Sequence, residues 1–258
     1  MSKLRYVYGI VPASAAAVVD PSEIAGIDSA RVRAIVDGSL AAAYSEVDDA
    51  EYGEAGLNER VRDLDWLAPR AAAHQSVNAR LLELAGVVLP LSFGALYRDD
   101  ARVKEMLRQD APARRARLDA LAGRGEWVVT VLREAASAPG AADELRTLDA
   151  EIASSAPGKG YLLEKRRTTV ANEAADRADA DAAERALGAL VRVAERSYRE
   201  PVARGGSDVV VLRVSLLAPR AKAGVLDGAI AAVTRDLDPL GYRVRATGPW
   251  PAYRFGSL

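Results

Sequence analysis

The chain of 258 residues has no cysteine, a single histidine and few aromatic side chains. Without cysteine it can form no disulfide, no thiolate metal site and no thiol nucleophile, which suits a reducing cytoplasm. With His74 as the only histidine, the usual multi-histidine metal site is excluded, and we predict neither a metal nor a cofactor. No apolar run approaches the ~20 residues of a membrane span. The sequence therefore predicts a soluble protein that does not use a lipid membrane as its partner.

An excess of charge of one sign is also missing. The 35 basic residues balance 36 acidic ones and leave a net charge of −1. Because no field of one sign then covers the molecule, a general role in binding nucleic acid or a membrane surface is disfavoured. Lys3 and Arg5 before the apolar run 6–11 superficially resemble a signal peptide, but this run is short and stops at Pro12. A first strand is the better interpretation.

Nucleotide-binding motifs are missing too. Gly158-Lys159-Gly160 suggests a phosphate loop, but the glycine required five residues before Gly158 is absent. Gly160 also stands where the Ser or Thr that meets magnesium would be. We therefore reject nucleotide binding by motif.

The apolar pattern of the first half predicts an α+β domain with the order β–β–α–β–α–β. Val87–Phe93 is nearly continuously apolar and predicts a strand buried on both faces, in which Pro90 indicates an edge position or a bulge. Gly86 is placed as a helix C-cap and Asp99 as part of a helix start. The predicted strands are 4–11, 39–47, 87–93 and 126–132, and the predicted helices are 57–85, with a break near Pro69, and 99–123. This order resembles a ferredoxin-like sandwich with helices on one sheet face, which we place at residues 1–135.

The second half predicts another α+β domain, at residues 141–258. The Pro139-Gly140 pair in 134–140 indicates a linker before it. The predicted helices are 141–153, 167–198 and 221–237, and the predicted strands are 209–217 and 242–247. The long helix carries alanine over Ala171–Ala186, a small-residue surface that lets another helix approach closely.

Three groups of residues are candidates for chemistry or binding. His74 favours a structural role that anchors its helix, because the nearby Ser92 lies outside any Gly-x-Ser-x-Gly elbow. The basic run that holds Arg114, Arg115 and Arg117 lacks the aromatic interleaving that stacks bases, and a solvated helix face explains it. Trp250, between two prolines, favours a plug packed on its own C-terminal domain, with an anchor for a partner as the alternative.

Five segments together resemble the GvpL/GvpF family of gas vesicle proteins, in the right order along nearly the whole chain. They are Tyr6-Val7-Tyr8-Gly9-Ile10, the segment around His74, Leu89-Pro90-Leu91-Ser92-Phe93-Gly94, Glu126-Trp127, and Gly248-Pro249-Trp250-Pro251-Ala252-Tyr253-Arg254-Phe255. The acidic segment 37–65 and the alanine-rich helix lie outside the resemblance. Structural or partner-binding roles are expected for residues of these motifs: Pro90, Phe93, Gly94, Trp127, Gly248, Pro249, Trp250, Pro251, Tyr253 and Phe255.

The resemblance implies a minor structural or assembly protein of gas vesicle formation, in the cytoplasm and at the gas vesicle. Its implied partners are the small hydrophobic gas vesicle shell protein and other gas vesicle accessory proteins, and no enzymatic activity is implied. We expect shell-protein binding through apolar and backbone contacts, on the alanine surface of 171–186 or at a sheet edge. Two alternatives stay open: a ferredoxin-like small-molecule-binding protein or enzyme that uses His74, and an RNA-binding protein that uses Arg114 to Arg117.

Overall fold

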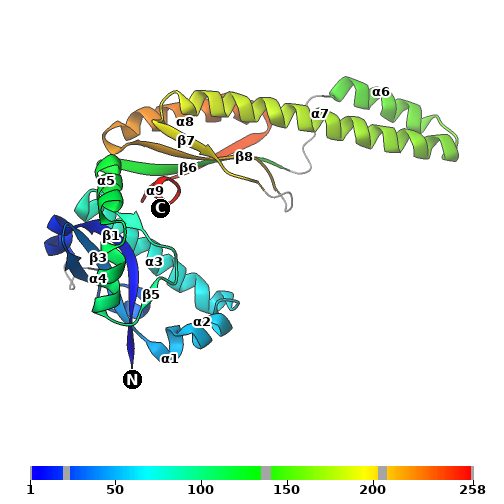
Figure 1. Ribbon diagram of the computed structural model, residues 1–258. Coiled ribbons are helices and arrows are strands. Elements are labelled where there is room, and N and C mark those ends of the chain that lie inside the picture. Colours follow the sequence, from blue (N-terminus) through cyan, green and yellow to red (C-terminus); the bar gives the residue numbers. More distant parts are fainter. Residues whose placement is uncertain (1, 20–23, 135–140, 203–207, 257–258) are drawn as a thin grey trace. The chain divides into compact units, whose positions relative to one another are not determined.

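The computed structural model describes residues 2–19, 24–134, 141–202 and 208–256 (Figure 1). Residue contacts divide the chain into two compact units: residues 1–126 with 249–258, and residues 127–248. Each unit has its own sheet and helices, which confirms the predicted α+β class. Within the described residues, no helix is both long and apolar enough to cross a membrane.

The sheet of the first unit has the strand order β2-β3-β1-β4, with β5 also paired to β1. Its strands are β1 (Lys3–Pro12), β2 (Arg33–Asp37), β3 (Leu40–Asp48), β4 (Leu89–Pro90) and β5 (Leu96–Tyr97). Each of the pairs β1–β3, β2–β3, β1–β4 and β1–β5 is antiparallel. This is the order of a ferredoxin-like sheet, in which the 3₁₀ turns η1 (Ala13–Val18) and η2 (Ile27–Ser29) replace the first crossover helix.

The predicted strand at 87–93 is the largest local error of the sequence interpretation. Only Leu89 and Pro90 pair as β4, and the chain then leaves the sheet before β5. Pro90 does lie at an edge, because β4 ends the strand order of the described sheet. Strand β2 was missed, since its five residues are too few to show alternation.

The helices of the first unit begin and end largely where local chemistry places them. Gly86 closes α3 with a left-handed φ of 75°, and Asp99 caps α4 by accepting a hydrogen bond from the Arg102 N–H. The predicted break at Pro69 is wrong, because the chain breaks at 61–63 and Asp63 caps a new helix. The helices are α1 (Asp49–Tyr52), α2 (Glu54–Arg60), α3 (Leu64–Ala85), α4 (Asp100–Arg108), α5 (Ala111–Leu121) and α9 (Tyr253–Gly256).

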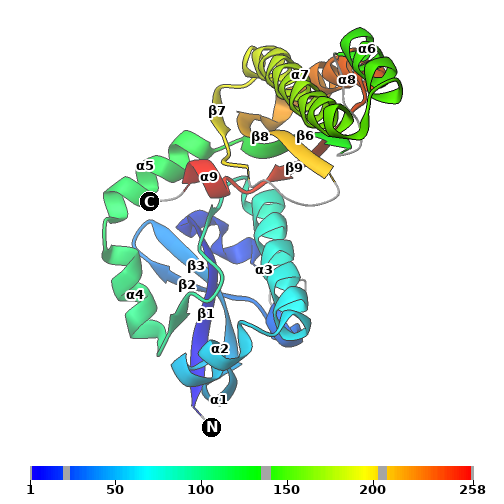
Figure 2. The same cartoon turned by 90° about the vertical axis from the view of Figure 1, so that its right-hand side faces the viewer.

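Helices cover both faces of this sheet. Every residue from Tyr6 to Val11 in β1 is buried, which a sheet with one solvent-facing side does not allow. Figure 2 shows α3 on one side of the sheet and α4 with α5 on the other. The first unit therefore has a third layer that the predicted two-layer sandwich lacks.

The sheet of the second unit has the order β7-β8-β6-β9. Its strands are β6 (Arg124–Glu134), β7 (Arg196–Arg199), β8 (Asp208–Pro219) and β9 (Tyr242–Trp250). Strand β6 was expected to close the first domain but lies in this second sheet. The chain passes between the units at 126–127 and 248–249, which differs from the sequence-based ranges 1–135 and 141–258. Most of the expected linker, residues 135–140, lies outside the described residues.

Three helices accompany this second sheet: α6 (Ala142–Ala153), α7 (Pro157–Val191) and α8 (Ala223–Leu237). Figure 1 shows α7 and α8 along one face of the sheet. Helix α7 begins ten residues earlier than predicted, with Pro157 at its first position, where a missing N–H costs nothing. It also ends earlier, and Tyr198 lies in the exposed strand β7. The alanine surface is buried within this unit at Ala174, Ala175, Ala182, Ala183 and Ala186.

A buried ion pair ties α7 to its sheet. Arg133 of β6 donates from Nε to Asp179 Oδ1 at 2.7 Å and from a terminal nitrogen to Oδ2 at 2.9 Å. Tyr242 of β9 donates to the same carboxylate at 3.0 Å. Burial raises the pKa of Tyr242 to about 12, so this phenol stays protonated and keeps donating. This ion pair fixes the position of α7 along the sheet, because the small alanine side chains of its buried face specify that position only weakly.

We predict that Asp179→Ala lowers the free energy of unfolding of the second unit by about 3–5 kcal/mol, because it leaves the buried Arg133 without this carboxylate. Urea unfolding followed by hydrogen exchange of the β8 amides measures the loss. The matched control is Asp149→Ala, which breaks an exposed pair with Arg167 and should change stability little. Equal effects of the two substitutions would contradict a special role for the buried pair.

Candidate functional site

The edge of the first sheet opens between β4 and β5, and residues 91–95 form what we call the edge loop. At its start the Leu91 N–H donates to the Tyr8 carbonyl at 2.9 Å, and at its end the Val7 N–H donates to the Ala95 carbonyl at 2.9 Å. Five residues thus stand opposite two residues of β1. Gly94 has a φ of +87°, which favours glycine, and it turns the loop back toward the sheet.

His74 of α3 is hydrogen-bonded to the edge loop and to Tyr6. Its Nε2 lies 3.1 Å from the Leu91 carbonyl oxygen, and its Nδ1 lies 2.9 Å from the Tyr6 hydroxyl. A carbonyl only accepts, so Nε2 carries the proton and Nδ1 accepts from Tyr6. The Gly94 N–H donates to the Tyr6 hydroxyl at 3.2 Å. Both ends of the edge loop are therefore hydrogen-bonded to one neutral Tyr–His pair.

Asn78 lies one turn after His74 and completes this network. Its amide nitrogen donates to the Tyr8 carbonyl at 3.1 Å and to the His74 carbonyl at 3.3 Å. The same nitrogen lies 3.1 Å from His74 Nε2, but both atoms carry hydrogen in the assigned tautomer, so this contact is no bond. Asn78 Oδ1 is buried and has no hydrogen-bond partner among the described residues.

A second polar network engages the hydroxyl groups of Tyr8 and Tyr52. Tyr8 donates to Ser45 at 3.0 Å and accepts from the Ile27 N–H at 2.8 Å. Arg70 of α3 donates to the Tyr52 hydroxyl at 2.8 Å and pairs with Asp28 at 2.8 Å. The rings of Tyr6, Tyr8, Tyr52, His74 and Phe93 pack together, with centroids 5.0–6.4 Å apart for the pairs that include Tyr6.

The electrostatics of this site favour neutral side chains. Burial lowers the pKa of His74, although its bond to the Leu91 carbonyl works in the opposite direction. Burial also raises the pKa of Tyr6 and Tyr8. Because Tyr6 and Leu91 occupy both nitrogens of His74, this histidine does not activate Ser92, which is exposed. The geometry therefore favours a structural role for His74, as the sequence predicted.

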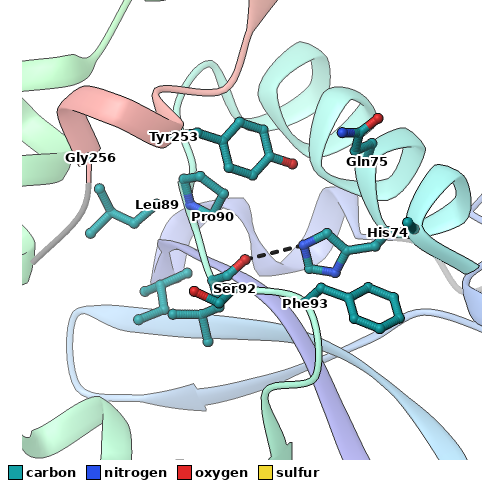
Figure 3. Close-up of a pocket in the computed structure, with 11 residues that line it drawn as sticks. His74, Gln75, Leu89, Pro90, Ser92, Phe93, Tyr253 and Gly256 are labelled. Carbon is teal, nitrogen blue, oxygen red and sulfur yellow. Dashed lines mark hydrogen bonds between the residues drawn. The ribbon is translucent and has the colours of Figure 1, made fainter. Parts of the chain in front are cut away.

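A pocket of about 510 Å³ lies between α3, the edge loop and α9 (Figure 3). Ile10, Leu89, Pro90 and Phe93 contribute apolar surface to it. Tyr253 closes one side, and Figure 3 shows its hydroxyl directed toward α3. The remaining lining residues are Ala71, His74, Gln75, Leu91, Ser92 and Gly256. No residue of this lining is charged when His74 is neutral.

A hydrogen bond to a buried carboxylate joins the C-terminal motif, residues 248–255, to the first unit. Glu126 is 4% exposed and accepts a hydrogen bond from the Arg254 N–H at 2.8 Å. A side chain added at Gly256 would lie 3.5 Å from Leu121 and 3.7 Å from Leu89, so this end of the chain packs on the first unit. The expectation that the motif plugs its own C-terminal domain is therefore wrong. Trp250, at the end of β9, is of intermediate exposure.

The structure brings some of the predicted candidates together and separates others. Pro90, Phe93 and Tyr253 line the pocket, and Gly94 belongs to the Tyr6–His74 network. Pro251 and Phe255 are buried, whereas Gly248 and Pro249 are exposed. Trp127 belongs to the apolar core of the second unit. The sequence interpretation assigned no role to Tyr6, Tyr8, Asn78 or Glu126. The family segments contain Tyr6, Tyr8 and Glu126, and for Asn78 the signal is a polar residue within an apolar pattern.

Several arginines of the basic clusters are engaged in contacts within the chain. Arg114 is 9% exposed and donates to the Met106 carbonyl, while Arg115 pairs with Asp119 at 2.8 Å. Arg167 pairs with Asp149. These contacts occupy part of the positive charge that the RNA-binding alternative would use. In the described parts of the chain, no three His, Asp or Glu side chains are grouped closely enough to hold a metal ion.

Fold and site together define a two-unit α+β protein whose signature segments meet around a neutral, buried network beside an uncharged pocket. The family described as "Gas vesicle synthesis protein GvpL/GvpF" matches residues 4–257. The chain belongs to the GvpL/GvpF family, as the resemblance of its motifs predicted, and therefore has a role in gas vesicle formation.

Known proteins agree with this assignment. Gas vesicle protein L of Streptomyces sp. (strain CB03234) is 35% identical over 269 residues, which cover 99% of this chain and 94% of that protein. Gas vesicle protein L2 of Halobacterium salinarum is 28% identical, over 99% and 92% of the two chains. The crystal structure of GvpF from Anabaena sp. PCC7120 has a TM-score of 0.67 at 18% identity, with 100% and 97% covered. GvpF from Microcystis aeruginosa has a TM-score of 0.68 at 15% identity, with both chains fully covered.

We predict that Gly9→Ala destabilises the first unit by about 1–3 kcal/mol, the usual cost of overpacking a tight core. The added Cβ would lie 2.7 Å from Asn78 Oδ1 and from Val88 Cγ2, and 3.0 Å from the Leu89 carbonyl oxygen. Hydrogen exchange of the β1 amides under mild urea measures the change. The matched control, Gly228→Ala in α8, meets no atom within 4 Å and should stabilise its helix. A harmless Gly9→Ala would contradict the close approach of α3 and β4 to β1.

We also predict an acid-dependent loss of stability that depends on His74. The folded protein lowers the pKa of His74, so below the unfolded-state value of about 6.5 the unfolded chain binds more protons and stability falls. His74→Gln removes this titration. The stability advantage of the natural protein over the variant should therefore shrink as the pH falls from about 7.5 to 5. Urea midpoints across this range measure it, and a constant difference would contradict the prediction.

Proposed function

We propose that this chain is an assembly factor of gas vesicles that binds the unassembled shell protein and has no catalytic role. Family membership supports the part in gas vesicle formation. The absence of a catalytic role is supported by the site, where both nitrogens of the only histidine are hydrogen-bonded to Tyr6 and Leu91. We place the protein in the cytoplasm at the forming vesicle, with other gas vesicle accessory proteins as further partners.

Apolar and backbone contacts are the mode of binding that fits this chain. A shell built from a small hydrophobic protein exposes apolar segments before assembly, and such segments aggregate when they are left uncovered. The net charge of −1 gives little long-range steering toward a charged partner. Capture of an apolar partner by this chain therefore relies on short-range complementarity.

Two surfaces of the described structure suit such binding. One is the pocket beside the edge loop, which is uncharged and lined by Pro90, Phe93 and Tyr253. The other is β7, whose residues are all exposed and which ends the strand order of the second sheet. The alanine surface of α7 is no longer a candidate, because five of its alanines are buried inside the unit.

The test is capture of the shell protein at two salt concentrations. With this chain immobilised, we predict that shell-protein capture in ~0.5 M salt equals capture in dilute buffer, because exposed charge pairs are screened there. Release of the shell protein at the higher salt, while both proteins stay folded, would contradict binding through apolar and backbone contacts.

A deletion strain supplies the matching test in the cell. Loss of the gene should reduce the number of vesicles, and re-expression of the natural chain should restore them. A strain that forms normal vesicles without this chain would contradict the assembly role, whatever the capture experiment shows.

A further inference from the structure

We propose that this chain pairs with a second copy of itself through one exposed face of α7, with the two helices antiparallel. This pairing goes beyond the proposed function, because it joins two copies of the chain and does not involve the shell protein. Three observations support it: the exposure of that face, the distribution of charge along α7, and the match between the face and its own reverse.

A stripe of exposed residues runs along α7 at alternating steps of four and three positions, which keeps its members on one face of the helix. Figure 1 shows α6 beside the first part of α7 and the second sheet beside the rest. Neither of them covers the stripe, since each of its members is exposed. It is about 27 Å long at a rise of 1.5 Å per residue. We call it the α7 stripe, and its members are Leu162, Arg166, Thr169, Glu173, Asp176 and Ala180.

Charge is segregated along α7. Residues 157–167 hold four basic side chains and one acid, whereas residues 173–184 hold five acids and one arginine. The first turn has no acid, and Ala156 supplies no side-chain cap, so basic residues lie at the positive end of the helix dipole, where they are unfavourable for the helix itself. In an antiparallel pair each basic end lies beside the acidic part of the other copy, and the charges attract.

The charged members of the α7 stripe are not engaged elsewhere. Within the described part of the chain, Arg166, Glu173 and Asp176 make no side-chain hydrogen bond or ion pair. The adjacent Arg167, which lies off the stripe, pairs instead with Asp149 of α6. The charges on the stripe therefore remain available to a second molecule.

The stripe matches its own reverse when Thr169 of one copy faces Glu173 of the other. Arg166 then faces Asp176 of the other copy, and Leu162 faces Ala180. Each contact occurs in both halves of the pair, because the arrangement is two-fold symmetric. A parallel pair would instead place each residue opposite its own copy, so that Arg166 faces Arg166 and Asp176 faces Asp176. Charge complementarity therefore selects the antiparallel arrangement.

The composition of the stripe predicts a weak dimer that depends on salt. Leu162, which is 65% exposed in the single chain, is its one large apolar side chain, so pairing buries little apolar surface. Exposed ion pairs each contribute little and are screened by salt. We therefore expect association at high protein concentration and low ionic strength.

Sedimentation equilibrium of the full chain tests the pairing. At ~0.02 M salt we expect a monomer–dimer equilibrium with a Kd of about 10–500 μM, and at ~0.5 M salt a Kd at least about tenfold higher. A chain that stays monomeric up to about 1 mM at the lower salt would overturn the proposal. A dimer of equal strength at both salt concentrations would overturn it as well.

Charge reversal locates the contact. Arg166→Asp and Asp176→Arg each place like charges opposite one another, and each variant alone should self-associate at least about tenfold more weakly. A mixture of the two variants restores both ion pairs in a mixed dimer and should associate about as tightly as the natural chain. Circular dichroism first establishes that each variant is folded, since Asp176 also acts electrostatically on the buried Arg133. If Asp176→Arg does not fold, Arg166→Asp alone decides.

Glu164→Arg is the matched control. It reverses the charge of an exposed residue of the same helix that lies two positions from both Leu162 and Arg166, on the side turned away from the stripe. It should self-associate like the natural chain. Equal self-association of the natural chain and Arg166→Asp, or a mixture no tighter than the single variants, would overturn the proposal. Shell-protein capture does not enter these measurements, so their outcome leaves the proposed function untouched.

Discussion

The buried hydroxyl of Tyr6 is the group on which the edge of the first sheet depends. It accepts from Gly94 at one end of the edge loop and donates to His74, whose other nitrogen holds Leu91 near the loop's beginning. Loss of any member would leave the others buried and unsatisfied, which costs more than the bond itself contributes. The edge loop gives up hydrogen bonds of the sheet, and the hydrogen bonds that join Gly94, Tyr6, His74 and Leu91 replace them.

The elements of this fold that could be predicted are those determined by residues close to one another in the sequence. Strand β1, the cap at Gly86 and the helix start at Asp99 each follow from chemistry within a few positions. The edge loop could not be predicted, because the apolar run 87–93 has the composition of a strand and only distant partners draw it away. Strand β7 is equally hidden, since its four exposed residues become a strand only by pairing with β8.

The candidate site shows the same division. Pro90, Phe93 and Tyr253 could be singled out through the family motifs, yet nothing in the sequence places Tyr253 across a pocket from His74. The bond from Tyr6 to His74 joins residues 68 positions apart. The C-terminal motif was assigned to the wrong unit because proximity in sequence favours the neighbouring strand, whereas the Glu126 carboxylate holds this segment on the first unit.

The network beside the pocket in the first unit and the core of the second unit contain different kinds of buried polar group. The second unit buries a charged pair, Arg133 with Asp179, whose desolvation is offset by two-point geometry and by Tyr242. The network that borders the pocket in the first unit uses neutral hydroxyl, imidazole and amide groups. A charged pair there would impose a field on the pocket and favour ionic occupants. A neutral network leaves shape and hydrogen-bond polarity to decide what binds beside it.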